Sequence, residues 1–203
     1  MTVSFKSLKF VCSIIALSFS FLVQSQEFQF GAKGGINIAS ISFSDSDYST
    51  SSVIGVHVGA FGKFSIDEKL AIQPELFFST GGNTWSISNV EGEINTTHLT
   101  LPVLLQYSIT DALYAEAGPQ YSFLLSIKQS INDGESEDIK EFYKSGAFGL
   151  GIGIGYNLES LVSGLSANVR YTTDLTDIND VEVDAGSLKS NMFQIGLAYT
   201  FSK

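Results

Sequence analysis

Large apolar residues alternate with small or polar residues along most of this chain. The clearest case is the stretch 191–201, whose first face carries Phe193, Ile195, Leu197, Tyr199 and Phe201. The opposite face carries Met192, Gln194, Gly196, Ala198 and Thr200. Alternation with a period of two predicts a β-strand that has one apolar face and one wettable face.

The same pattern predicts eight strands, at 27–40, 53–66, 70–84, 96–109, 113–127, 142–157, 164–175 and 191–201. The connections between them are alternately long and short, starting with a long one at 41–52. Short turns at one end and long loops at the other are typical of outer-membrane barrels, whose short turns are periplasmic. The sequence therefore predicts a closed, eight-stranded, antiparallel, up-and-down transmembrane β-barrel with both termini in the periplasm.

The direction of the amphipathicity decides between a membrane barrel and a soluble one. The apolar columns contain no charged residue, whereas the opposite columns hold glycines, hydroxyls and ions. A Lys or Arg facing lipid at mid-depth costs about 2–4 kcal/mol, so this absence is expected of an outward face in a bilayer. A soluble lipocalin-like carrier would place its large apolar residues inside and conflicts with the pattern.

Aromatic residues and prolines refine the prediction. Two girdles are expected at the membrane interfaces, one formed by Phe64, Tyr107, Tyr156, Tyr199 and Phe201, the other by Phe78, Phe123, Phe148 and Phe193. Proline removes a hydrogen-bond donor from the sheet, so bulges or rim positions are expected at Pro74, Pro102 and Pro119.

Residues 1–25 are predicted to be a secretory signal peptide, followed by one barrel domain at 26–203. Lys6 and Lys9 precede an apolar run from Phe10 to Val23, and Val23-Gln24-Ser25 fits a cleavage site with small residues. The alternative, an N-terminal membrane anchor, needs a run of about 20 apolar residues. Removal of this segment takes away the single cysteine, Cys12, so no disulfide or thiol chemistry is expected.

The charge of the chain excludes some partners and leaves others open. Without Lys6 and Lys9, nine basic residues remain against 21 acidic ones, a net charge of −12. This balance argues against nucleic-acid binding, which needs a basic patch. The long connections hold 14 of the 21 acids. They lack the spacing of a calcium-binding motif, so a solvated loop surface is expected and neither a metal nor a cofactor is predicted.

Five charged residues fall in the inward columns, namely Lys33, Lys63, Glu75, Glu116 and Arg170. The interior of an eight-stranded barrel is just wide enough for side chains to fill. Ions placed there must pair, so we expect a structural polar network across the lumen. A continuous wet path for ions is the alternative.

His57, Ser79 and His98 are predicted to face inward near the extracellular rim. A histidine beside a hydroxyl could activate a nucleophile for lipid modification. Such catalysis needs a third group that orients the base, and no such group is visible. We therefore predict that the protein is not an enzyme and has no catalytic residues.

Several short segments resemble the PorT-like outer-membrane β-barrel proteins. They are Gly31–Asn37, Gln73–Leu76, Leu101–Val103, Glu116–Pro119, the glycine-alternating strand at 142–157, Asn168–Tyr171 and the last strand. The resemblance covers nearly all of 27–202 and implies an eight-stranded barrel in the outer membrane of a Gram-negative bacterium. It implies no catalytic residues.

We expect an integral outer-membrane protein whose barrel is an anchor in outer-membrane lipid. Its acidic loops or its periplasmic rim would contact another envelope protein. The alternatives are a narrow pore or small-ligand-binding barrel and, third, a lipid-modifying enzyme.

Overall fold

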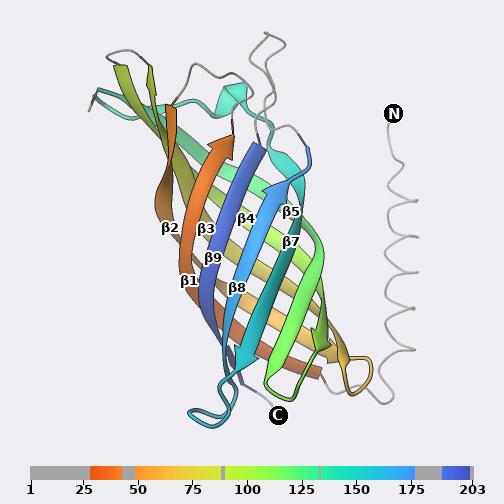
Figure 1. Ribbon diagram of the computed structural model, residues 1–203. Helices are drawn as coiled ribbons and strands as arrows, with labels where there is room; N and C mark the ends of the chain where they lie inside the picture. The colour runs from red at the N-terminus through yellow and green to blue at the C-terminus, as the bar shows by residue number, and fades with distance from the viewer. Residues whose placement is uncertain (1–27, 43–48, 88–89, 133, 177–188, 202–203) are drawn as a thin grey trace, which may run out of the picture.

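The computed structural model describes residues 28–42, 49–87, 90–132, 134–176 and 189–201. Eight long strands form a ring in the order β1, β2, β3, β4, β5, β7, β8 and β9 (Figure 1). Their bounds are β1 Phe28–Ser42, β2 Ser49–Ser65, β3 Leu70–Ile87, β4 Val90–Ser108, β5 Leu113–Ile131, β7 Gly146–Asn157, β8 Leu165–Asp174 and β9 Lys189–Thr200. Strand β6 (Glu137–Asp138) and the 3-10 helix η1 (Lys140–Phe142) lie between β5 and β7.

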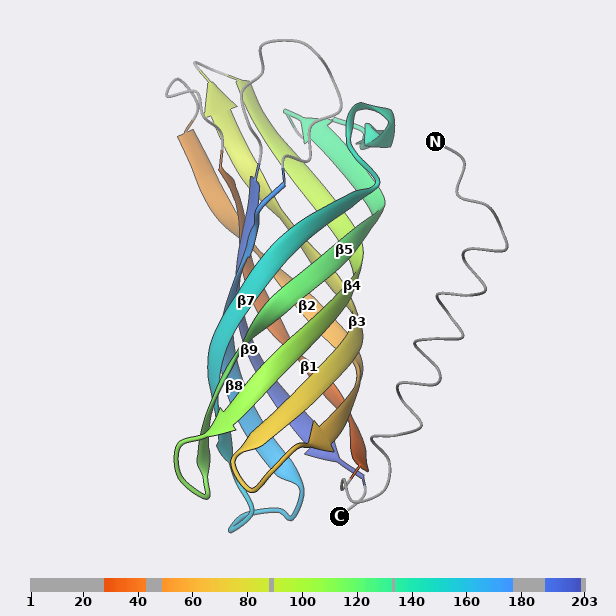
Figure 2. The ribbon, with the colours of Figure 1, turned by 90° about the vertical axis from the view of Figure 1, so that its right-hand side faces the viewer.

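Pairing between the first and last strands closes the ring. The β1–β9 ladder is antiparallel and runs from Gly31 opposite Thr200 to Ser42 opposite Lys189 without a register shift. All the neighbouring pairs are also antiparallel, and the strands wind around a common axis (Figure 2). The predicted closed, eight-stranded, antiparallel barrel is therefore confirmed. No helix in the described part of the chain is long and apolar enough to cross a membrane.

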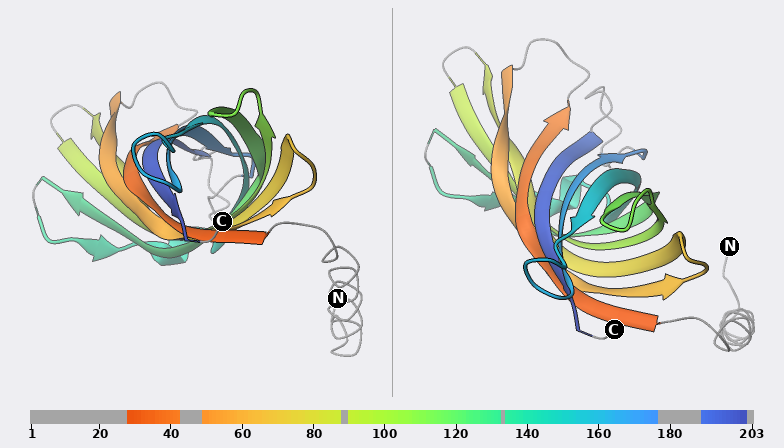
Figure 3. Two further views of the ribbon diagram at one scale, coloured as in Figure 1. Left: turned by 90° about the horizontal axis from the view of Figure 1, so that it is seen from below. Right: turned by 60° about the horizontal axis from the view of Figure 1, so that its bottom comes forward.

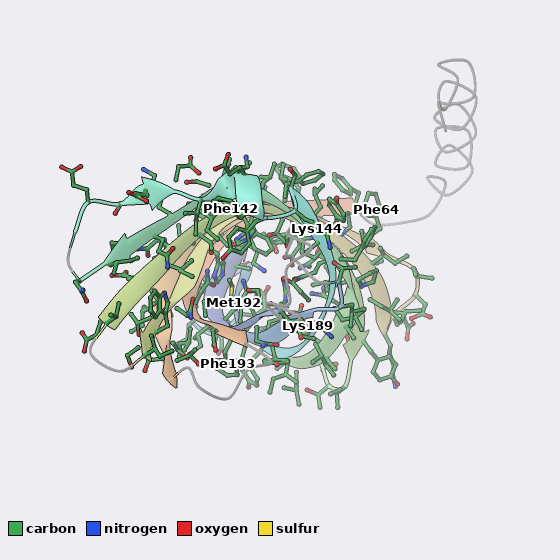
Figure 4. The ribbon with its side chains drawn as sticks, turned by 90° about the horizontal axis from the view of Figure 1, so that it is seen from above. Phe64, Phe142, Lys144, Lys189, Met192 and Phe193 are labelled. Atoms are coloured by element: carbon green, nitrogen blue, oxygen red, sulfur yellow. The ribbon has the colours of Figure 1, made fainter. Side chains whose placement is uncertain are left out.

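The predicted faces of the strands are also confirmed. Ile54, Val58, Ile152 and Ile154 are exposed on the outside of the ring, whereas Lys33 and Arg170 are buried inside it. In the view along the axis, Met192 points into the ring and its neighbour Phe193 points out (Figure 4). The barrel thus places polar and charged side chains inside and apolar side chains outside.

The connections identify the two ends of the barrel. The turn end carries the short connections 66–69 and 109–112, the connection 158–164, the start of β1 at Phe28 and the end of β9 at Thr200. The loop end lies opposite and carries β6. Aromatic rings contact one another near the turn end, where the ring centres of Phe28 and Phe64 are 4.8 Å apart. A second group of ring contacts lies farther toward the loop end, where the ring centre of Tyr121 is 4.7 Å from that of Phe123 and 4.6 Å from that of Phe148.

Strands β2, β3, β4 and β5 continue beyond the closed ring at the loop end (Figures 1 and 3). Pairing of β1 with β2 stops at Ala39 and Val53, and pairing of β5 with β7 stops at Phe123 and Gly146. Beyond these points, residues 49–52, 83–87, 90–96, 124–131 and 137–138 form an open sheet, which we call the extension. In the described residues, the 49–52 edge of this sheet has β3 as its strand neighbour and no partner on the other side.

The extension corrects the predicted strand ends. Residues 85–95 were expected to form a loop but lie in β3 and β4, which together leave only 88–89 between them. Residues 49–52 and 128–131 are likewise in strands, whereas 142–145 precede β7. The reason is that the outward side chains of the extension, such as Thr84, Glu91 and Glu93, are polar. Side chains of the extension still alternate between two faces, but the outward face is not apolar there, so the hydrophobic pattern does not reveal these strands.

The expectation for the three prolines is wrong, because none lies at a bulge or a strand end. Pro74 lies opposite Val103, Pro102 opposite Gln120 and Pro119 opposite Leu150, all within strands. The β3–β4 ladder skips two residue pairs after Pro74, and the β4–β5 ladder skips two pairs after Pro102, and both resume in the same register. The missing N–H donors of the prolines are accommodated by these gaps in the ladders and not by an inserted residue.

The register shifts occur elsewhere. One lies between Ser52 and His57 in the β2–β3 pair, and the other between Thr97 and His98 in the β4–β5 pair. Both lie toward the loop end, between the barrel and the extension. The predicted signal peptide at 1–25 lies outside the described residues.

Replacing Ile152 by Arg tests whether the outward face lies in lipid. Ile152 is 64% exposed in the middle of β7. We expect Ile152→Arg to lower the free energy of unfolding from lipid vesicles by about 2–4 kcal/mol, measured by urea titration. The matched control is Leu161→Arg, at a 75% exposed residue in the connection 158–164. It should change the stability by about 0.5 kcal/mol or less. Equal losses in the two variants would contradict a lipid-facing β7.

Candidate functional site in the barrel lumen

A cluster of ion pairs crosses the lumen, and Arg170 on β8 lies at its centre. The guanidinium donates from Nη1 and Nη2 to the two carboxylate oxygens of Glu75, both at 2.8 Å. It also donates from Nε to Glu116 Oε1 at 2.8 Å, and its Nη2 lies 2.7 Å from the same oxygen. The planar fork of an arginine suits such a bidentate contact with a carboxylate. Arg170 is 1% exposed, so the whole interaction is shielded from solvent.

Glu75 on β3 is the second branching point. Besides Arg170, it accepts a hydrogen bond from Lys33 Nζ on β1 at 2.9 Å and one from Gln73 Nε2 at 2.8 Å. Glu116 on β5 accepts a further hydrogen bond from Gln106 Nε2 at 3.1 Å. We call Lys33, Glu75, Glu116 and Arg170 the charge cluster. Its formal charges cancel, and its members come from every second strand of the ring, so one layer of side chains joins four strands.

Glycine residues provide the space for this layer. On β7, Gly153 lies between Glu116 on β5 and Arg170 on β8 in the strand registers. A Cβ at Gly153 would lie 3.1 Å from Glu116 Oε1 and 2.5 Å from a backbone oxygen. The ion pair between Glu116 and Arg170 therefore depends on a bare backbone at this position. The alternating glycines of β7 leave room for side chains from the neighbouring strands.

Lys63, the fifth predicted member of the polar network, lies apart from the ion pairs. Its Nζ is 5.8 Å from the centre of the Tyr114 ring, and the residue is only half-buried. Three salt bridges are found among the described residues, and all of them join members of the charge cluster. The structure thus brings four of the five predicted residues together and leaves Lys63 on the side of the turn end.

A second polar group lies on the loop-end side of the charge cluster, around Asn37. Its Nδ2 donates to the backbone oxygens of Val56 and Thr80, both at 3.0 Å. Its Oδ1 is therefore the acceptor for His57 Nδ1 at 2.8 Å and for Gln194 Nε2 at 3.3 Å. This arrangement makes Nδ1 the protonated nitrogen of His57, while Nε2 has no partner in the described part of the chain.

The three residues of the predicted rim cluster are neighbours in the strand registers, because His57 lies opposite Ser79 and Ser79 lies opposite His98. His98 lies at the loop-end limit of the closed ring, because it pairs with Leu124, one residue beyond the last β5–β7 pair. His57 and Ser79 lie deeper than predicted, near the middle of β2 and β3, since these strands continue into the extension. His57 and Ser79 are each 3% exposed. No carboxylate is hydrogen-bonded to either histidine among the described residues, and the partner of His57 is an amide.

The described residues contain no group of three or more His, Cys, Asp and Glu side chains arranged to hold a metal ion. Asp174 lies at the end of the strand predicted at 164–175 and was counted with the acids of the last long connection, but it is the last residue of β8 and is buried inside the ring. Arg170, Thr172 and Asp174 alternate at a period of two, and this signal could have placed Asp174 in the lumen.

Tyr143 packs against an apolar group of Ile94, Leu124 and Ile127 under the extension, and burial raises the pKa of its phenol.

A closed antiparallel ring with an apolar exterior and an ion-paired interior defines a β-barrel membrane protein. The sequence model of the family described as outer membrane protein beta-barrel domain matches residues 24–180, which is more than half of the chain. The chain belongs to this family and is an outer-membrane β-barrel protein.

Several solved structures are similar to this chain. Neisserial surface protein A is 14% identical with a TM-score of 0.50, and the match covers 88% of this chain and 100% of that one. Ail, the attachment invasion locus protein of Yersinia pestis, is 14% identical with a TM-score of 0.49, covering 86% and 99%. OprG from Pseudomonas aeruginosa is 14% identical with a TM-score of 0.48, covering 88% and 98%. No curated protein sequence matches the chain.

The charge cluster makes a prediction for stability. Arg170→Met leaves Glu75 and Glu116 buried with one lysine, and it should lower the free energy of unfolding by about 3–5 kcal/mol, measured by urea titration in vesicles. The matched control is Lys63→Met, which removes a lumen cation outside the cluster and should cost about 1 kcal/mol or less. The double variant Arg170→Met/Glu116→Gln should be more stable than Arg170→Met, because it rebalances the charge. Equal losses of unfolding free energy in Arg170→Met and Lys63→Met would refute the central role of Arg170.

Proposed function

We propose that this protein is an outer-membrane anchor that presents its extension and acidic connections to a partner in the cell envelope. In this proposal the loop end is extracellular and the turn end is periplasmic. The proposal extends to a signal peptide at 1–25 and to membership of the PorT-like group, on the motifs described above. The observation that carries it is the extension, an open sheet on a barrel whose lumen is filled by side chains.

The charge cluster supports an anchor over a pore. It lies across the lumen and joins β1, β3, β5 and β8 through hydrogen bonds of 2.8–2.9 Å. An eight-stranded barrel has little interior space beyond that occupied by its side chains. Ions would have to pass a layer that is itself charged, buried and fully paired. The narrow-pore alternative therefore requires these ion pairs to open.

The extension has the features of a docking sheet. Its 49–52 edge presents backbone N–H and C=O groups that an extended peptide can pair with by strand addition. Its own apolar group, Ile94, Leu124 and Ile127, is packed against Trp85, Ile139 and Tyr143, so the sheet has its own support above the membrane.

Charge defines the kind of partner. The described residues at the loop end include six acidic side chains outside the ring, Glu91, Glu93, Glu135, Glu137, Asp138 and Glu141. Seven further acids and no basic residue lie in the connecting residues 43–48, 133 and 177–188. Four lysines oppose them, at 128, 140, 144 and 189. Such an excess attracts a basic surface and accelerates its association.

Conductance measurements separate the anchor from the pore. We expect the purified barrel in planar bilayers to carry no steady ionic current, because the charge cluster occupies the lumen. Two variants are compared with the wild-type protein: Arg170→Met removes the central cation of the charge cluster, and Lys63→Met removes a lumen cation outside it. A steady current from the wild-type protein would favour the narrow-pore alternative over the anchor.

Chemical crosslinking in intact cells followed by affinity capture tests the interaction. Glu135→Gln/Glu137→Gln removes two exposed charges, one in β6 and one just before it, and we expect it to reduce recovery of the crosslinked partner several-fold. The matched control is Glu68→Gln/Asp111→Asn, which removes two exposed charges at the turn end and should leave recovery unchanged. If the turn-end variant alone loses the partner, the contact is at the periplasmic rim. If both variants keep it, the charge-based contact at the loop end is wrong.

A further inference from the structure

The two edges of the extension differ in how the described part of the chain covers them. On the β5 side, β6 pairs with Lys128 and Gln129, and Lys140 Nζ donates to the backbone oxygen of Leu125 at 3.1 Å. On the β2 side, the 49–52 edge contains only serine and threonine, without the charges or prolines that commonly block strand addition. Within the described residues, this second edge is open to a further strand.

A polar hollow of about 380 Å³ lies on the outward face of the extension, beside this open edge. One row of its lining side chains crosses four strands. Ser51 on β2 lies opposite Thr84 on β3, which in turn lies opposite Glu93 on β4. Glu93 lies opposite Ser130 on β5. Because Ser51 belongs to both features, the hollow begins directly at the open edge.

The hollow is acidic and has no basic residue in its lining. Glu91 and Glu93 line it together with hydroxyl groups, and no lysine or arginine does. Asn95 Nδ2 donates to Glu93 Oε1 at 2.9 Å, which orients the Glu93 carboxylate. A guanidinium has five N–H donors and no acceptor, so it matches a lining of carboxylate and hydroxyl oxygens.

The distance from the edge decides which side chain can fill the hollow. A strand added beside β2 would lie three strand spacings, or about 14 Å, from Glu93. An extended arginine on that strand and an extended Glu93 together span this distance, and the arginine would cross Ser51 and Thr84. The other face of the added strand would meet Thr50 and its cross-strand neighbour Trp85, which suits an apolar residue.

We propose that the extension binds an extended segment of a partner protein as an additional strand beside residues 49–52, with an arginine side chain of that segment in the hollow. The bound segment alternates between basic residues on its outward face and apolar residues on its inward face. Backbone pairing provides affinity, and the hollow provides the preference for arginine. This inference rests on the envelope partner proposed above and names the kind of segment that the extension recognises in it.

Fluorescence anisotropy with the refolded full barrel in detergent micelles tests this proposal. The labelled probe is an end-blocked peptide of the sequence Thr-Val-Arg-Val-Arg-Val-Thr. The same peptide with its central backbone nitrogens methylated keeps the charge but cannot pair as a strand, and we expect its Kd to be weaker by about tenfold or more. Glu93→Gln should weaken binding of the probe by about fivefold. The matched control Glu141→Gln removes an exposed charge at the same end outside the hollow and should change the Kd by less than about twofold.

Equal Kd values for the probe and the methylated peptide would overturn the proposal, and so would equal effects of Glu93→Gln and Glu141→Gln, because binding would then follow only the overall negative charge. Thr84→Arg is a second variant, whose own guanidinium would reach Glu93 across one strand spacing and fill the hollow. It should weaken probe binding several-fold, and an unchanged Kd contradicts the hollow as the site. The crosslinking variants Glu135→Gln/Glu137→Gln lie outside the hollow. A partner captured through them in cells, combined with a failed peptide test, rejects the strand-addition mode and leaves the proposed function in place.

Discussion

A chain that crosses a bilayer as strands must satisfy every backbone N–H and C=O group within the protein, because lipid offers no partner. The β1–β9 ladder meets this requirement by removing both edges of the sheet. Closure with eight strands also decides what lies inside, since the lumen is then only as wide as its side chains. The inward glycines, the ion pairs and the apolar exterior all follow from this closure.

The charged side chains of the lumen can be buried because they form ion pairs, with as many cations as carboxylates. Two cations and two carboxylates from β1, β3, β5 and β8 meet in one layer, and glutamines from β3 and β4 donate to the remaining oxygens. Several neutral polar atoms of the lumen have no hydrogen-bond partner among the described residues, including Gln106 Oε1, Asn168 Oδ1 and Gln194 Oε1. Where the ring ends, the sheet no longer needs to be closed, and within the described residues the 49–52 edge of the extension is unpaired.

Much of this arrangement could be predicted from alternation alone, including the eight strands, their faces and four members of the charge cluster. The alternation of apolar and polar residues is visible only where one face of a strand touches lipid, so it does not reveal the strands where they continue beyond the membrane. Residues 85–95 were therefore predicted to be a loop, and His57 was placed too close to the rim. Asp174 was not recognised as a lumen residue, although it continues the period-two pattern of Arg170 and Thr172. The prolines were misjudged because the sheet tolerates a local gap between strands, which depends on the neighbouring strands and not on the proline itself.

The central claim is that apolar side chains point outward into lipid and charges point inward. Apart from Cys12 the chain has no cysteine, so single cysteines with nitroxide labels can be placed at the even-numbered positions from 148 to 156 on β7 and, for the lumen, at Ser122 and Ser190, which line cavities. Collision rates with oxygen dissolved in lipid should be high at the β7 positions and low at the two lumen positions. The opposite order, or β7 labels shielded from both lipid and water, would contradict the outward apolar face.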